Sequence, residues 1–295
     1  MEKISLILDG GGMRGAYGGG VVTALTDLGL KTVDHATGSS AGIANLAWYV
    51  AGLAHPGVRV WTEVTTTPTF LSLTNVFHHI PYFNIDYLVD NIMKTHPVLG
   101  IPRRKLIHSK INFRIPVADT ETGKAKYFSN KSRHDIFEIF RAAFAIPVVY
   151  NKVVQIGKKS YFDGAYADPL PLDISGVKES RKIIVLNSAN DEEHFGMEHH
   201  FAHLKMDLPK GIVKLLSAWP KIYWKRVKQA EKLEEEGHIL LRPKTSISRI
   251  DNVRKHVAAH VRWGYQDVKA CTPLRKLIKE LKESPKKEFY FSSPA

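Results

Sequence analysis

A serine flanked by small residues stands between a strand-like run and a helix-like run. The turn Gly38-Ser39-Ser40-Ala41-Gly42 follows TVDHAT and precedes IANLAWYV. A nucleophile elbow has this order of strand, sharp turn and helix, and small neighbours let backbone and substrate approach the serine closely. The pattern predicts that Ser40 is a nucleophile, with Gly38 and Gly42 as the elbow glycines. A Gly/Ser/Ala turn with no chemical role is the alternative.

A glycine-rich loop precedes this turn. In LDGGGMRGAYGGG, Gly10, Gly11 and Gly12 follow the apolar run ISLIL and lead into a helix-like stretch. Backbone N–H groups at a helix N-terminus have no partner within the helix and can converge on one anion. That anion could be a developing oxyanion or a phosphate, because Gly10-x-Gly12-x-x-Gly15 is also the dinucleotide fingerprint.

Nucleotide binding therefore stays an alternative function for the Gly10–Gly15 loop. Asp34 lies about twenty residues on, where a ribose-binding acid is expected. Two features count against this alternative: Asp9 would place a carboxylate beside the pyrophosphate, and a second sharp turn follows Asp34 within a few residues.

Ser40 needs a base, because a free hydroxyl is a weak nucleophile. The chain has 14 histidines, none in a recognisable catalytic setting. His199 and His203 have a weak metal-like spacing without a third ligand, which we interpret as a solvated helix face. A different candidate is Asp163, followed by Gly164 and Ala165 in YFDGAYADPLPL, although Asp-Gly is also a common turn pair.

The pattern of apolar residues places these groups on an α/β fold. Strand and helix candidates alternate from the N-terminus, which favours a parallel sheet. DYLVDNIM and DIFEIFRAAFA are predicted helices, KIIVLNS is a predicted buried strand, and two hairpins should turn at 122–123 and 157–159. The irregular stretch 58–104 is where we expect a lid, if the protein has one.

Composition limits the class of protein. The chain has 295 residues, 44% of them hydrophobic and 24% charged, which predicts a globular protein. A single cysteine, Cys271, excludes an intrachain disulfide and a cysteine-based zinc cluster. No apolar run approaches the ~18 residues of a membrane span, so we expect a cytoplasmic protein. The net charge of +13 favours an anionic partner or is simply a well-solvated surface.

Taken in order, these stretches resemble the patatin-like phospholipase family, in particular its small bacterial-type members. The match covers most of the first 175 residues. Its motifs follow one another with the spacing of that family: DGGGMRG, GSSAG, RAAFAIPVVY and YFDGAYADPLPL. Many members have Asp-Gly-Gly where this chain has Asp-Gly-Ala. The resemblance implies a patatin-like three-layer α/β/α sandwich with a mostly parallel central sheet.

The resemblance also implies roles for individual residues. Ser40 would be the nucleophile and Asp163 its base, without a histidine, in a dyad that hydrolyses lipid or phospholipid esters through an acyl-enzyme. The loop containing Gly10, Gly11, Gly12, Arg14 and Gly15 would form the oxyanion hole, and Gly164 and Ala165 would shape the Asp-Gly-Ala loop. The implied mechanism needs no metal or cofactor, and we expect no nucleic-acid partner.

The C-terminal part carries no motif of this family. We expect a catalytic core over 1–190 and a basic, mainly helical extension over 191–295 that packs on it, together one structural domain. The 210–232 segment is a basic amphipathic stretch, which Pro220 should divide into two helices. Its aromatic stripe is predicted to pack on the core, with peripheral docking on an anionic membrane as the alternative. A catalytically idle membrane-binding relative is the third functional reading. A last helix should be capped by Thr272.

Overall fold

The structure is a computed structural model, which describes residues 2–72, 81–147, 149–150, 152–189 and 208–292. His199 and His203 lie outside these ranges, so the interpretation of their spacing is not addressed by the fold.

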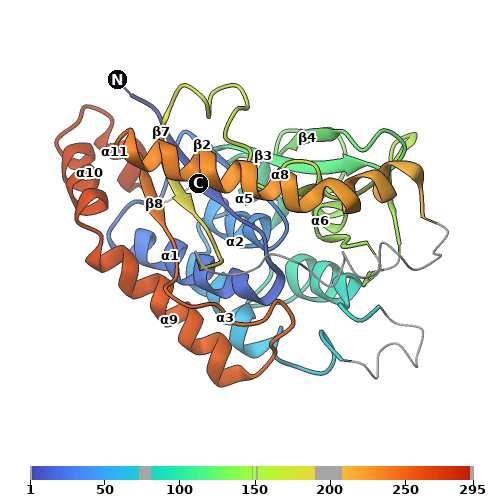
Figure 1. The fold of residues 1–295 in the computed structure, drawn as a ribbon. Coiled ribbons are helices and arrows are strands. Elements are labelled where there is room, and N and C mark those ends of the chain that lie inside the picture. The colour runs from blue at the N-terminus through green and yellow to red at the C-terminus, as the bar shows by residue number, and fades with distance from the viewer. Residues whose placement is uncertain (1, 73–80, 148, 151, 190–207, 293–295) are drawn as a thin grey trace.

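One mixed sheet of eight strands forms the centre of the molecule (Figure 1). Its order is β5-β6-β3-β2-β1-β7-β8, and β4 pairs with β3. Strands β3, β2, β1, β7 and β8 pair in parallel, and the other pairings are antiparallel. The predicted α/β class is therefore confirmed. The strands are β1 (Ile4–Leu8), β2 (His35–Gly38), β3 (Asn112–Asp119), β4 (Ala125–Ser129), β5 (Val154–Ile156), β6 (Lys159–Asp163), β7 (Arg181–Val185) and β8 (Ile239–Leu241).

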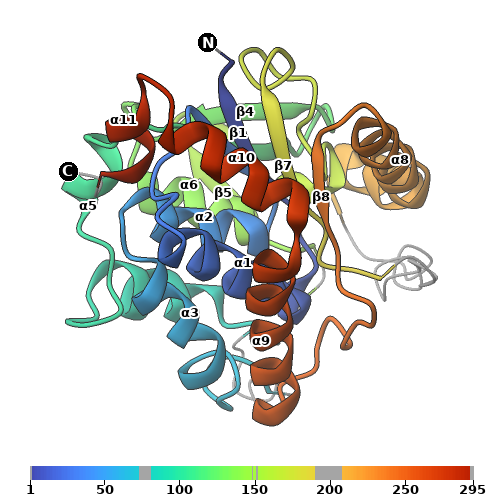
Figure 2. The ribbon, with the colours of Figure 1, turned by 90° about the vertical axis from the view of Figure 1, so that its left-hand side faces the viewer.

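Helices cover both sides of the sheet, and Figure 2 shows α8 on one side of β7 and β8 with α1, α2 and α3 on the other. This arrangement confirms the predicted α/β/α sandwich. The longer helices are α1 (Ala16–Asp27), α2 (Ala41–Val50), α3 (Ala54–Glu63), α6 (Ile136–Phe144), α8 (Lys210–Glu235), α9 (Arg254–Ala270) and α10 (Thr272–Lys282). The shorter ones are η1 (Gly12–Gly15), α5 (Arg103–Ile107), η3 (Gly164–Tyr166) and α11 (Lys287–Phe291), and η2 (Tyr87–Lys94) is a wide π-type helix.

Residues beyond 190 complete the sheet and one helical layer. Strand β8 pairs in parallel with β7, with Ile183 opposite Ile239. Helix α9 crosses α1 so closely that a Cβ at Gly20 would lie 1.9 Å from the carbonyl oxygen of Val261. A Cβ at Gly264 would lie 2.0 Å from the carbonyl oxygen of Tyr17. Only glycine permits this approach of two backbones.

Both predicted hairpins are present. Strands β3 and β4 turn through Gly123, which has φ +67°, and β5 and β6 turn through Gly157, which has φ +66°. A positive φ is a conformation that glycine adopts without a steric cost. The second turn is one residue shorter than expected, because Lys159 already pairs with Ile156 in the ladder.

Two predictions about helix boundaries were wrong. Pro220 lies inside α8, which continues without a break from Lys210 to Glu235. Leu216, Trp219 and Tyr223 are buried on both sides of the proline, so packing of one apolar face outweighs the hydrogen bond that proline lacks. In α10, Cys271 is the N-cap and Thr272 is the first helical residue, with no side-chain cap.

Candidate active site

Ser40 lies at the sharp turn between β2 and α2. Its backbone has φ 47° and ψ −124°, and it is the only residue other than glycine with a positive φ in the described part of the chain. A strained conformation of this kind at a turn persists where the surroundings hold it, and such positions cluster at functional sites. A Cβ at Gly38 would lie 2.2 Å from the carbonyl oxygen of Leu8, and one at Gly42 would lie 2.4 Å from it. The two glycines therefore let the turn pack directly on β1.

The glycine loop after β1 lies beside this serine. A Cβ added at Gly10 would be 3.1 Å from the Cβ of Ser40. Gly11 and Gly12 have φ +119° and +59°. Among the described residues, no hydrogen bond engages the N–H of Gly11 or Gly12, whereas the N–H of Met13 donates to Arg249 O at 3.0 Å. The loop that carries these two unengaged N–H groups therefore contacts the candidate nucleophile through Gly10.

Two side chains and one backbone carbonyl from other segments hold the glycine loop. Asn187 Nδ2 donates to the carbonyl oxygens of Asp9 at 2.6 Å and Gly10 at 3.0 Å. Arg14 Nε donates to Ile247 O at 2.8 Å, and Arg14 also reaches the hydroxyl of Ser188. Arg14 thus ties the loop to these two segments.

Gly15 was predicted as a member of the oxyanion loop, and its surroundings show a packing role. A Cβ at Gly15 would lie 2.5 Å from the Cβ of Ala41 and 2.7 Å from the ring of Trp61. The glycine therefore lets the start of α1 contact the start of α2, one residue after Ser40.

Asp9 is a buried acid at the start of the glycine loop. Its carboxylate accepts a hydrogen bond from the hydroxyl of Tyr223 at 2.8 Å. Burial raises the pKa of Asp9 to about 6, even though the Tyr223 hydroxyl, the Arg249 charge and backbone N–H groups of Gly10 and Asn187 favour the ionised form. The proton on this acid therefore exchanges close to neutral pH.

The register of the sheet brings Asp163 to the same end of β2 as Ser40. Within β3, Arg114 lies between β2 and β4, and Val117 lies between β6 and β4. Strands β2 and β6 therefore share one edge of β3. Asp163 pairs with Val117, and Thr37 of β2 pairs with Arg114. Val117 lies about 10 Å further along β3 than Arg114 does. Ser40 follows Thr37 by three residues, in the same direction.

Asp163 is buried, with 1% of its surface exposed. Its carboxylate accepts a hydrogen bond from the N–H of Ala165 at 2.8 Å, and its own N–H donates to the carbonyl oxygen of Ala145 at 3.0 Å. A Cβ at Gly164 would lie 2.3 Å from Pro116 O, so this turn also needs its glycine.

Helix α8 contacts this second loop as well. Trp219 Nε1 donates to Ala165 O at 3.1 Å, and the guanidinium of Arg249 lies 4.8 Å from the centre of the Trp219 ring. Trp219 and Tyr223 are one helical turn apart. One face of α8 therefore supports the Asp-Gly-Ala loop and the acid that precedes the glycine loop.

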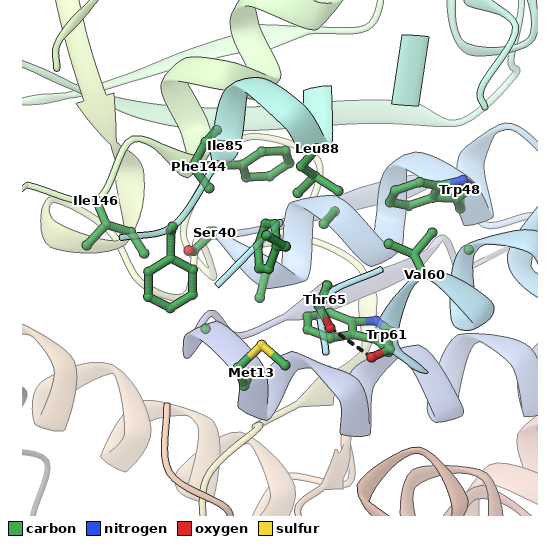
Figure 3. A pocket seen from close by; sticks show the side chains of 16 residues that line it. Met13, Ser40, Trp48, Val60, Trp61, Thr65, Ile85, Leu88, Phe144 and Ile146 are labelled. Carbon is green, nitrogen blue, oxygen red and sulfur yellow. Dashed lines mark hydrogen bonds between the residues drawn. The ribbon is translucent and has the colours of Figure 1, made fainter. Parts of the chain in front are cut away.

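An apolar pocket that is partly open to solvent has Ser40 in its wall (Figure 3). Met13, Phe144 and Ile146 are among the residues of its wall, and 58–104 contributes further wall residues. Three polar groups of the wall are already paired: Trp48 Nε1 with Leu99 O, Trp61 Nε1 with Asn45 Oδ1, and Thr65 Oγ1 with Trp61 O, each at 2.8 Å. The pocket thus offers hydrocarbon surface, with the Ser40 hydroxyl at one end.

One other sequence-based expectation, the position of Asp34, has a clear structural outcome. Asp34 lies before β2, at the opposite end of that strand from Ser40, and accepts hydrogen bonds from Ile4 N and the Tyr290 hydroxyl. Its proposed place beside a ribose was therefore wrong. Among the described residues, no three His, Cys, Asp or Glu side chains come together as a metal site would need. Within the same ranges, no helix has the length and apolar character needed to cross a bilayer.

Sequence reasoning did not identify three residues as parts of this site: Asn187, Trp219 and Tyr223. Tyr223 and Trp219 had been recognised only as members of an aromatic stripe. Their contacts join segments more than 50 residues apart, so no local spacing could have indicated them.

The fold and the turn define an α/β sandwich protein with an elbow serine at the carboxyl ends of parallel strands, where open α/β sheets bind their ligands. The sequence model of one family, the patatin-like phospholipases, matches residues 6–175. The chain belongs to this family.

Individual relatives are distant. The uncharacterized protein YjjU of Escherichia coli (strain K12) is 22% identical over 193 residues, 65% of this chain and 54% of that protein. The chain thus spans about half the length of this curated relative. The crystal structure of VipD from Legionella pneumophila matches with a TM-score of 0.55 at 15% identity, over 95% of this chain and 67% of that one. This second likeness concerns the fold.

Proposed function

We propose that this protein is a serine acyl hydrolase that cleaves carboxylic ester bonds of lipids. The observation that carries the proposal is the strained Ser40, whose hydroxyl stands at the end of a pocket with an otherwise apolar or internally paired wall. Membership of the patatin-like phospholipase family supports hydrolysis of lipid esters in general. A hydrocarbon chain is the ligand portion that such a wall accommodates at the lowest cost, because any polar group placed there would lose its hydrogen bonds to water.

In the proposed mechanism, the Ser40 oxygen attacks the ester carbonyl carbon while Asp163 accepts the hydroxyl proton. The N–H groups of Gly11 and Gly12 stabilise the oxyanion of the tetrahedral intermediate. The intermediate collapses when the carbon–oxygen bond to the alcohol breaks and Asp163 returns its proton to the leaving oxygen. Water, deprotonated by Asp163, then attacks the acyl-enzyme, the bond between the acyl carbon and the Ser40 oxygen breaks, Asp163 returns the proton to Ser40, and the free acid is released.

Two structural observations support Asp163 as the base. The register along β3 directs its strand towards the end of β2, and its backbone bonds to Ala145, next to the pocket residues Phe144 and Ile146. Its burial keeps the carboxylate away from bulk water.

The test is hydrolysis of a medium-chain p-nitrophenyl ester by wild type, Ser40→Ala and Asp163→Asn. We expect losses of about 10⁴-fold or more for Ser40→Ala and about 10²- to 10⁴-fold for Asp163→Asn, with thermal unfolding unchanged. Ser39→Ala is the matched control, because the Ser39 hydroxyl donates to Pro169 O at 2.8 Å and is already engaged.

Labelling of wild type by a fluorophosphonate reports the same nucleophile without an ester. Labelling that survives in Ser40→Ala would disprove Ser40 as the nucleophile. Full activity in Asp163→Asn would place the base elsewhere.

A further inference from the structure

The pocket follows one face of α2 for almost the whole helix. Ser40, Ala44 and Trp48 recur at intervals of four residues and all line it, so they lie on one side of the helix. Ala41 and Ala44 leave a shallow floor near Ser40, and Trp48 fills the far end. Figure 3 shows Ser40 and Trp48 on different sides of the cavity, with Ile146 beyond Ser40.

Trp48 is a fixed end wall. Its side chain is 3% exposed, and its Nε1 donates to Leu99 O at 2.8 Å. Helix α3 packs directly behind it, since a Cβ at Gly57 would lie 2.5 Å from the Cβ of Trp48. A ring held by a hydrogen bond on one side and by backbone on another cannot move aside without breaking those contacts.

The length of the pocket follows from helix geometry. Eight residues separate Ser40 from Trp48, which corresponds to about 12 Å along the helix axis. An extended chain advances about 3.6 Å for three bonds, or about 1.2 Å for each bond. The distance therefore accommodates about eight to ten carbons beyond the attacked carbonyl.

We propose that Trp48 sets the length of the acyl chain, so that the enzyme selects medium-chain acyl esters and disfavours long-chain ones. This inference rests on the proposed function, because it assumes that the acyl group bound to Ser40 occupies the pocket. Ala44 lies halfway, about 6 Å from Ser40, and its small side chain keeps the passage to Trp48 open.

The experiment compares kcat/KM for p-nitrophenyl butyrate, octanoate, laurate and palmitate. Wild type should prefer octanoate over palmitate by about tenfold or more, since a poorly accommodated methylene costs about that factor. Trp48→Ala should raise the palmitate-to-octanoate ratio about tenfold. Ala44→Leu should act in the opposite direction, retaining butyrate hydrolysis and losing that of octanoate.

Trp263→Ala is the matched control, because Trp263 is 38% exposed on α9 and does not line the pocket. Its chain-length profile should equal that of wild type. If Trp48→Ala does not fold, the shift in Ala44→Leu still tests the direction of the pocket. An active wild type with no drop at palmitate, or an unshifted profile in Ala44→Leu, overturns the proposal for Trp48 alone. A wild type that neither hydrolyses any ester nor reacts with fluorophosphonate overturns the proposed function as well.

Discussion

The N-terminal glycine loop and elbow, residues 9–42, differ from helix α8 in what they contribute to the same site. The first region holds Ser40 and the N–H groups of the loop beside it. Helix α8 contributes Tyr223 and Trp219, which donate to Asp9 and to Ala165 O and take no part in the proposed bond-making steps. Reacting groups and their supports thus come from segments that are far apart in the chain. Substitutions in the two regions should therefore fail in different ways.

After the loss expected for Ser40→Ala, the largest effect in this region is expected in the glycine loop, for Gly12→Ala. Gly12 has φ +59°, and a Cβ there would lie 2.6 Å from Arg249 O, so the loop must shift and its N–H groups lose their position. We expect kcat to fall about 10²-fold, as when one oxyanion donor is lost. Steady-state kinetics with octanoate esters measures this loss. A variant with wild-type kcat would show that the loop does not stabilise the oxyanion.

The next effect concerns the acid at the start of the same loop. The pKa of Asp9 in the folded protein is about 6, above its ordinary value of 3.8. The folded state therefore binds this proton more tightly than the unfolded chain does. The resulting stabilisation is complete below about pH 4 and is lost as pH rises through about 6, about 3 kcal/mol in all. Asp9→Asn should remove this decline, measured by urea unfolding between pH 4 and 7.

A buried histidine on α9 provides the opposite case and a check on that result. Burial lowers the pKa of His260 to about 4, from an ordinary value of 6.5. Neither ring nitrogen has a hydrogen-bond partner among the described residues. The contribution of neutral His260 to the free energy of unfolding is present above about pH 6.5 and is lost as pH falls towards 4. It again amounts to about 3 kcal/mol. His260→Leu should therefore make stability fall more steeply as pH rises. Identical pH profiles of the two variants and wild type would contradict both shifts.

A smaller effect is expected on the α8 side, for Tyr223→Phe. The substitution removes one hydrogen bond to Asp9, worth about 1–2 kcal/mol of unfolding free energy, and should lower kcat up to about tenfold while KM stays unchanged. Tyr265→Phe is the control, because its hydroxyl donates to Asp27 over the same 2.8 Å on the surface, away from the site. Equal kinetic effects in both variants would show that Tyr223 has no special role in positioning the loop.

The smallest effect is expected on the outer face of α8. Its apolar stripe, including Ile212 and Leu215, is buried, so a membrane would meet mainly exposed lysines, together with Val213, which is 42% exposed. Replacing Lys214, Lys221 and Lys225 together by Gln should change the unfolding free energy by less than about 0.5 kcal/mol for each site. Sedimentation with anionic phosphatidylserine vesicles tests the membrane prediction. Binding by wild type that the triple variant loses would support it, and no binding by wild type would reject it.

Much of the framework follows from local patterns. The apolar run Ile4–Leu8 is a strand, and the predicted strand KIIVLNS overlaps the strand Arg181–Val185. The hairpin glycines Gly123 and Gly157 have the positive φ that their turns require. The error at Pro220 shows the limit of such patterns, because the local cost of a proline is small beside the burial of an apolar face two turns long. Asp34 shows another limit, since the start of a strand cannot be distinguished from its end by counting residues.

The sequence by itself determined the family, the α/β class and the candidates Ser40, Asp163 and Gly10 to Gly12, because each occupies a short motif whose spacing reflects a local backbone requirement. The tertiary structure decided which side chains support them, where the pocket ends and which face of α8 is buried. Tyr223 reaches Asp9 across 214 positions of the chain. Such contacts depend on how α8 packs against segments that are distant in the chain, and long-range packing of this kind leaves no trace in local spacing.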